Sequence, residues 1–115
     1  MELFSLRDKV AVVTGACGLL GTQHCEALAA AGAQVVAADL DEKGCSALAT
    51  RLGSGHIGIG MDVTSTASLQ AARQRIMDRY GRIDVLVNNA AVNDMFENPA
   101  LAGHQSMFED RKSVV

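Results

Sequence analysis

The sequence has no excess of basic residues and no long apolar run. Ten Lys and Arg stand against 13 Asp and Glu, for a formal net charge of −3, whereas a chain that binds nucleic acid or an anionic membrane is usually basic. No stretch could span a bilayer, and the opening MELFSLRDKV lacks the apolar core and cleavage site of a signal peptide. We therefore expect a cytoplasmic protein with no nucleic-acid or membrane partner.

Cysteine and histidine are also too sparse for a disulfide framework or a metal centre. The cysteines are odd in number and fit no C-x-x-C spacing. They are Cys17, Cys25 and Cys45. None of the three histidines belongs to a ligand-like cluster. The sequence therefore predicts free thiols in a reducing compartment and no bound metal.

Four short runs of β-branched and small apolar residues are typical of buried strands. They are residues 9–14, 34–38, 56–61 and 83–87. Between these runs, apolar residues recur with helical spacing, and a glycine that can end a helix follows each set. The predicted helix faces are Leu20, Ala27, Leu28 and Ala31; Cys45, Leu48, Ala49 and Leu52; and Leu69, Ala72, Ile76 and Tyr80.

This alternation of strand and helix predicts an α/β fold. A chain of 115 residues with 49% hydrophobic content suits one compact core. Right-handed connections between parallel strands place helices on both faces of the sheet, and a Rossmann-like doubly wound half has strand order 3-2-1-4. We expect residues 1–91 to form this four-stranded βαβαβαβ half-domain. Residues 92–115 have no sustained period and are predicted to be irregular and partly disordered.

Three glycines stand where the first predicted strand turns into the first helix. Gly15, Gly18 and Gly21 would let the backbone and the N–H groups of the helix approach a pyrophosphate. Asp39 ends the second strand, where a carboxylate can accept hydrogen bonds from an adenosine ribose. A carboxylate there also repels a 2′-phosphate, so the pattern favours NAD over NADP. The alternative to a nucleotide site is that the glycines only form a tight turn and that Asp39 is a solvated acid in a loop.

Together these features resemble the short-chain dehydrogenases/reductases, over about residues 5–91. Beyond the acid that ends the second strand, the resemblance rests on the T-G that begins at Thr14, the Asp-Val pair at 62–63 and the N-N-A at 88–90. It implies an NAD(P)-dependent oxidoreductase that moves hydride between a nicotinamide and an alcohol or carbonyl. It covers only the N-terminal, cofactor-binding half of such an enzyme.

The resemblance also implies roles for residues after the third and fourth strands. Asp62 and Val63 would bind the adenine, and Asn88 and Ala90 would lie along the ribose of the nicotinamide. Asp62 could otherwise cap a helix, and Asn88 could be a turn residue. The predicted cofactor-binding residues are Gly15, Gly18, Leu20, Gly21, Asp39, Asp62, Val63, Asn88 and Ala90.

Two positions depart from the family pattern. The T-G-x-x-x-G-x-G spacing of the alcohol-oxidising branch would place glycine at 19, but the chain has Gly18 followed by Leu19. This spacing is more typical of the extended branch that modifies sugar nucleotides. The second departure is Ala91, where glycine is usual, and we expect that change to matter little.

The catalytic residues of the family are missing from these 115 residues. The family's reaction uses a serine and a tyrosine followed four residues later by a lysine. The single tyrosine, Tyr80, is followed by Asp84 and precedes the fourth strand, so we interpret it as a core residue. We expect no turnover from this chain alone. The alternatives are a non-catalytic dinucleotide-binding or interaction module, and a fragment of an extended-branch epimerase or dehydratase.

The fourth predicted strand is central in the full fold of the family. In a chain that holds four strands it would instead lie at an exposed sheet edge, where strands of separate molecules pair readily. The sequence therefore predicts self-association through residues 83–87.

Overall fold

A computed structural model describes residues 5–89, in which four strands alternate with three helices. The strands are β1 (Val10–Thr14), β2 (Gln34–Asp39), β3 (Ile57–Gly60) and β4 (Val85–Asn88). The helices are α1 (Leu19–Ala30), α2 (Glu42–Leu52) and α3 (Thr66–Tyr80). This alternation confirms the predicted element order. The predicted irregular segment, 92–115, lies outside the described residues.

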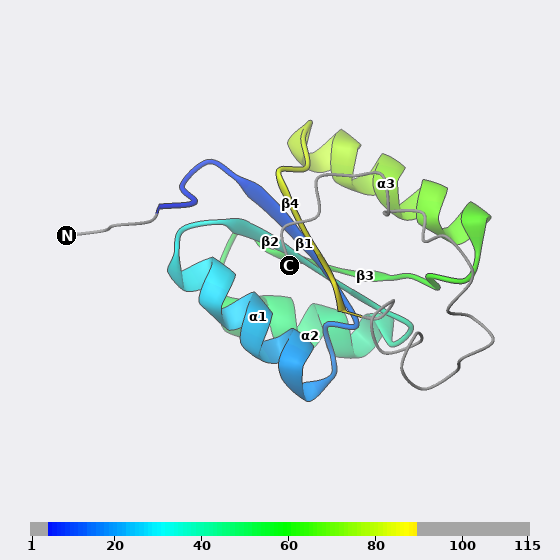
Figure 1. Ribbon diagram of the computed structural model, residues 1–115, viewed down its shortest axis with the longest axis horizontal. Helices are drawn as coiled ribbons and strands as arrows, with labels where there is room; N and C mark the ends of the chain where they lie inside the picture. The colour runs from blue at the N-terminus through cyan, green and yellow to red at the C-terminus, as the bar shows by residue number, and fades with distance from the viewer. Residues whose placement is uncertain (1–4, 90–115) are drawn as a thin grey trace.

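All four strands are parallel and lie in the order β3-β2-β1-β4, as predicted. Helices α1 and α2 cover one face of the sheet and α3 covers the other (Figure 1). The connection from β1 leads through α1 to β2 on one side, and β4 pairs on the other side of β1. The strand order therefore reverses at β1, which is where a doubly wound sheet opens a crevice at its carboxyl edge.

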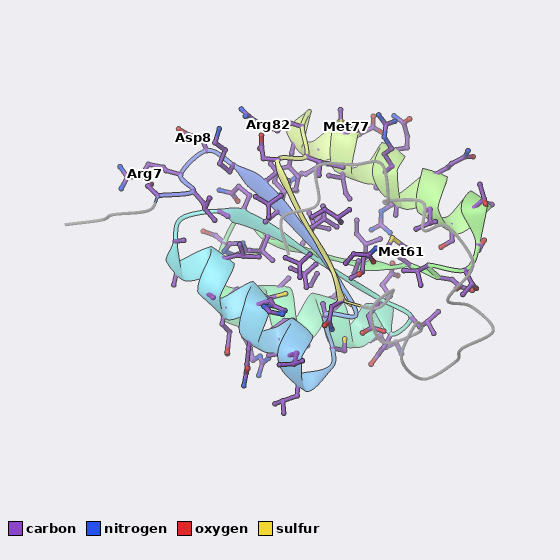
Figure 2. All side chains as sticks on the ribbon, viewed as in Figure 1. Arg7, Asp8, Met61, Met77 and Arg82 are labelled. Carbon is purple, nitrogen blue, oxygen red and sulfur yellow. The ribbon has the colours of Figure 1, made fainter. Side chains whose placement is uncertain are left out.

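The core consists of two layers separated by the sheet. All five residues of β1 are buried, with Ala11 and Val13 facing α1 and α2, and Val10 and Val12 facing α3. Figure 2 shows Met61, which follows β3, on the α3 side. Helices α2 and α3 bury the faces that the sequence predicts. Leu48 of α2 and Ile76 of α3 are examples.

The predicted face of α1 is wrong in part, because Leu28 packs against the core but the fully buried residues are not the predicted ones. Its buried residues are Gly21 and Cys25, whereas Leu20 is 57% exposed and Ala27 is also exposed. The reason lies in the turn from Gly15 to Gly18 that joins β1 to α1, here called the glycine turn. It brings the start of α1 so close to the backbone of Gly15 that only a residue without a side chain, Gly21, can face inward. A search for large apolar residues finds Leu28 on this face but misses the contact at the start of the helix, because glycine makes that contact.

Strand β4 also begins two residues later than predicted, because Ile83 and Asp84 form its lead-in. The backbone N–H of Val10 donates to Oδ2 of Asp84 at 2.9 Å, and the N–H of Asp84 donates to the carbonyl of Val10 at 2.9 Å. Arg82 donates two hydrogen bonds of 2.8 Å to the same carboxylate and, with the Val10 bond, keeps its pKa below the usual value. Figure 2 shows Arg82 near Asp8, at the amino edge of the sheet.

The alternating sequence of β3, IGIG, fits two different neighbours on its two faces. Ile57 and Ile59 pack on the α3 side. On the other face, a Cβ at Gly58 would lie 2.3 Å from the carbonyl carbon of Cys45 in α2. Real Cβ atoms do not approach backbone this closely, so glycine at 58 allows α2 to lie directly on the sheet.

We expect Gly58→Ala to destabilise the fold, because the added methyl group would push α2 off β3. Overpacking of this kind lowers the free energy of unfolding by about 2 kcal/mol. Gly18→Ala is the matched control, since a Cβ there meets only the carbonyl oxygen of Gly15 at an ordinary 3.5 Å. Urea denaturation should show a lower midpoint for Gly58→Ala alone. Equal midpoints for the two variants would contradict the packing argument.

Candidate functional site

The predicted site residues gather at the carboxyl edge of the sheet. Parallel register places Thr14 at the end of β1 opposite Asn88 of β4, and Asp39 at the end of β2 opposite Gly60 of β3. The glycine turn follows β1 at this same edge. Residues far apart in the sequence therefore lie together at the edge where a doubly wound sheet usually binds its ligand.

The glycine turn is shaped by the backbone itself. Gly15 has φ of +64°, a left-handed conformation that favours glycine. A Cβ at Gly21 would lie 2.1 Å from the carbonyl oxygen of Gly15, so α1 can begin here only with glycine at 21. The hydroxyl of Thr22 donates to the carbonyl of Ala16 at 2.9 Å and closes the turn.

The start of α1 offers backbone N–H groups to a ligand. Its N-cap residue, Gly18, makes no side-chain capping bond, and the first turn contains no acidic residue. The partial positive charge of a helix N-terminus is therefore not neutralised locally. A Cβ at Gly18 would meet only the carbonyl oxygen of Gly15 at an ordinary 3.5 Å, so the packing does not require glycine at 18.

Asp39 connects the glycine turn to β2. Its Oδ2 accepts a hydrogen bond of 2.9 Å from the N–H of Cys17, and its Oδ1 accepts one of 2.7 Å from the N–H of Leu40. A carboxylate has about four acceptor positions. Two remain for the hydroxyls of a ligand, so Asp39 can hold the turn and bind a diol at once.

Asp62 lies after β3 in a tightly hydrogen-bonded turn. Its Oδ1 accepts bonds from the N–H and the hydroxyl of Thr64 at 2.9 and 2.6 Å, and these bonds lower the pKa of its carboxyl group. The N-cap of α3 is Ser65, whose hydroxyl accepts a bond from the N–H of Ser68 at 3.2 Å. Asp62 is therefore not the cap of α3, and Val63, half-buried beside it, packs against the α3 layer.

The end of β4 is joined to the end of β1 by side chains. The buried hydroxyl of Thr14 lies 3.3 Å from both the carbonyl oxygen of Val87 and Oδ1 of Asn88. Asn89 donates to the carbonyl of Gly15 at 3.5 Å, which reaches the glycine turn itself. Ala90, the last predicted site residue, lies outside the described residues.

Several groups at this edge were not predicted as site residues. Thr14 and Asn89 lie within the quoted motifs, whereas the backbone N–H of Cys17 and the hydroxyl of Thr22 do not. A backbone donor has no sequence signal, and a threonine in the first turn of a helix is too common to mark a loop contact. Leu20, which was predicted, is exposed near the turn with Leu19 and Leu40. These apolar side chains are not part of the core.

A family model described as "short chain dehydrogenase" matches residues 9–110. The chain belongs to this family. It is 45% identical over 92 residues to D-threitol dehydrogenase of Mycolicibacterium smegmatis, which covers 77% of this chain and 35% of that protein. It is also 39% identical over 90 residues to galactitol 2-dehydrogenase of Agrobacterium fabrum, covering 78% and 35%. The chain thus spans about a third of the length of these relatives.

Solved structures of short-chain dehydrogenases match in the same way. A 3-ketoacyl-(acyl-carrier-protein) reductase of Brucella melitensis complexed with NADH aligns with a TM-score of 0.69 and 32% identity, covering 71% of this chain and 34% of that one. The RhlG/NADP complex of Pseudomonas aeruginosa aligns with a TM-score of 0.69 and 34% identity, covering 75% and 36%. The family has thus been solved with both dinucleotides.

The position of Tyr80 agrees with the prediction of a core residue. Its ring packs against the α3 layer, and its hydroxyl donates to the carbonyl of Gly55, which precedes β3 at the amino edge of the sheet. Burial raises the pKa of the phenol. The site at the carboxyl edge therefore receives no group from this tyrosine.

Other features of the described residues lie elsewhere. An open depression of about 600 Å³ between α2, β3 and α3 includes His56 and Arg79 but no predicted site residue. Within residues 5–89, no group of His, Cys, Asp or Glu is arranged to hold a metal ion. No helix in that range is long and apolar enough to cross a membrane.

Proposed function

We propose that this chain binds a nicotinamide dinucleotide at the carboxyl edge of its sheet, as the cofactor-binding part of a short-chain oxidoreductase. The observation that carries the proposal is the 2.9 Å hydrogen bond from the N–H of Cys17 to Asp39. It fixes the turn that would bind the pyrophosphate against the carboxylate that would bind the adenosine ribose. The spacing between these two subsites is thus set before any ligand arrives.

The remaining predicted residues complete the pocket in this proposal. Asp62 and Val63 border the adenine, and Asn88 with Ala90 lines the nicotinamide ribose. Leu20 covers the nucleotide from the first turn of α1, where its exposure suits an apolar contact with a ligand. In the cofactor-bound protein, the nicotinamide would accept or donate the hydride.

NAD is the preferred cofactor in this proposal. The carboxylate of Asp39 would accept hydrogen bonds from the ribose hydroxyls of NAD but repel the 2′-phosphate of NADP. Lys43, two residues beyond Asp41 at the start of α2, is the nearby cation in the sequence, and the Asp39 oxygens are bonded to backbone N–H groups instead. The site therefore suits an uncharged 2′-hydroxyl.

Calorimetric titration of the purified 115-residue chain with NAD and with NADP tests the proposal. We expect saturable binding of NAD, and no formation of NADH when D-threitol or galactitol is added, because Tyr80 cannot reach the crevice. A non-catalytic binding module would give the same result. The absence of NAD binding by a chain shown to be folded would contradict the proposed site. The named relatives are dehydrogenases and reductases, which does not favour the epimerase or dehydratase alternative.

We expect Asp39→Asn to reduce the preference for NAD. The variant loses the charge that repels a 2′-phosphate, so the ratio of the NADP and NAD dissociation constants should fall by roughly tenfold. A looser turn would weaken the binding of both dinucleotides equally, and the ratio of the two dissociation constants cancels that common effect. Asp41→Asn is the matched control, because it removes a nearby charge while asparagine still caps α2. An unchanged ratio in Asp39→Asn would exclude the assigned ribose contact.

Gly18→Ala should weaken NAD binding without a loss of stability. The protein around position 18 has room for a methyl group, so the variant should unfold at nearly the same urea concentration as the parent. A pyrophosphate lying against the turn would meet that methyl group, and we expect the dissociation constant to rise by about tenfold or more. Unchanged affinity would mean that the ligand does not approach the backbone there.

Self-association through β4 is a further part of the proposed behaviour. Within residues 5–89, β4 pairs with β1 alone and lies at one edge of the sheet. Strands with apolar side chains at such an edge favour pairing between molecules. Sedimentation velocity at roughly tens of micromolar should show dimers or larger species. A single monomeric boundary over that range would contradict this prediction.

A further inference from the structure

Two cysteines of different exposure meet beside the glycine turn. Cys17 lies in the turn and is exposed, whereas Cys45 lies in α2 and is buried. Their sulfur atoms are 3.6 Å apart, and the thiol of Cys17 also reaches the carbonyl of Asp41 at 3.8 Å. A Cβ at Gly44 would lie 3.0 Å from the same sulfur, so the Cys17 side chain rests directly on the first turn of α2.

We propose that Cys17 and Cys45 are an oxidative modification site, at which a small-molecule disulfide converts the two thiols into an intramolecular disulfide. The residues are 28 positions apart in the sequence, so the bond would tie the glycine turn to α2. Disulfides inside reducing compartments are usually transient and redox-sensing. The exposed partner gives an oxidant access, and the buried partner is reached only through it.

The exchange proceeds in two balanced steps. The thiolate of Cys17 attacks one sulfur of the small disulfide, breaks its S–S bond and releases one thiol, leaving a mixed disulfide on Cys17. The thiolate of Cys45 then attacks the Cys17 sulfur, and the second small thiol leaves. Two protein thiols are oxidised, one small disulfide is reduced to two thiols, and no metal or other cofactor takes part.

Packing decides which partner moves when the bond forms. A disulfide bond is about 2.05 Å long, so the sulfur atoms must approach by about 1.5 Å. Helix α2 cannot shift toward the sheet, because the backbone of Cys45 already lies where a Cβ of Gly58 would be. The approach must therefore come from the glycine turn, where Cys17 is exposed and where its N–H donates to Asp39.

The electrostatic surroundings make the exchange slow near neutral pH. Burial raises the pKa of both thiols, and the carboxylates of Asp39 and Asp41 raise them further. The hydrogen bond between the thiols acts in the opposite direction on Cys17. Because only thiolates attack, the bond should form on prolonged exposure or at mildly alkaline pH.

Intact mass spectrometry after incubation of the reduced chain with oxidised glutathione at mildly alkaline pH tests the proposal. We expect the loss of two hydrogens, a cross-linked peptide that joins Cys17 to Cys45, and full reversal by excess dithiothreitol. Stable glutathione on Cys17, a bond from Cys17 to Cys25, or a disulfide between two chains as the main product would each overturn it.

Single-cysteine variants provide the controls. Cys25→Ala removes the third thiol, which is buried in α1, and should still form the cross-link. Cys17→Ser should lose the cross-link, and because Cys17 is exposed the variant should fold. Cys45→Ser should stop at the mixed disulfide, provided that its circular dichroism matches the parent. A cross-link that survives in Cys17→Ser would place the reactive pair elsewhere.

The effect of the bond on the nucleotide rests on the proposed function and is measured separately. The NAD dissociation constant of the oxidised chain should be roughly tenfold higher than that of the reduced chain, because the Cys17 N–H would lose its position on Asp39. If the reduced chain binds no NAD, the proposed function fails while the mass result still decides the disulfide. Equal NAD affinities of the oxidised and reduced chains would show that the disulfide does not affect the nucleotide site.

Discussion

The structure depends on β1 being paired on both edges and buried on both faces. Parallel β2 and β4 occupy its edges, and α1, α2 and α3 cover its two sides. Once this strand is fixed, the carboxyl ends of its neighbours must meet beside Thr14, because all strands are parallel. The meeting of the strand ends is thus a geometric consequence of the strand order, and the groups found there come from a few residues at those ends.

The three glycines at the turn are subject to different structural constraints. Gly21 is required by the fold itself, since any side chain would strike the carbonyl of Gly15, and Gly15 is required by its left-handed backbone. Gly18 is required by neither. A motif interpreted as one unit in the sequence therefore separates into two glycines that shape the turn and one that the protein itself does not require, and a stability measurement distinguishes them.

Much of the fold could be predicted because its signals are local. Buried runs define β1 and β2, and helical spacing of apolar residues defines the faces of α2 and α3. The face of α1 was predicted only at Leu28, because the close approach of Gly21, not a large apolar residue, sets the orientation of the helix start. The bond from Cys17 to Asp39 could not be predicted either, because it joins a backbone donor to a side chain 22 positions away.

The two proposals, dinucleotide binding and disulfide formation, both involve the glycine turn. Its N–H at Cys17 is held by Asp39, and its thiol at Cys17 lies against Cys45 of α2. If the disulfide lowers the affinity for a nucleotide by some factor, the bound nucleotide must lower the equilibrium constant for disulfide formation by the same factor. This follows because free energies around a closed thermodynamic cycle sum to zero. A bound dinucleotide would therefore protect the thiols, and an empty site would leave them open to oxidation. The coupling needs no further contact, since one residue of the turn takes part in both events.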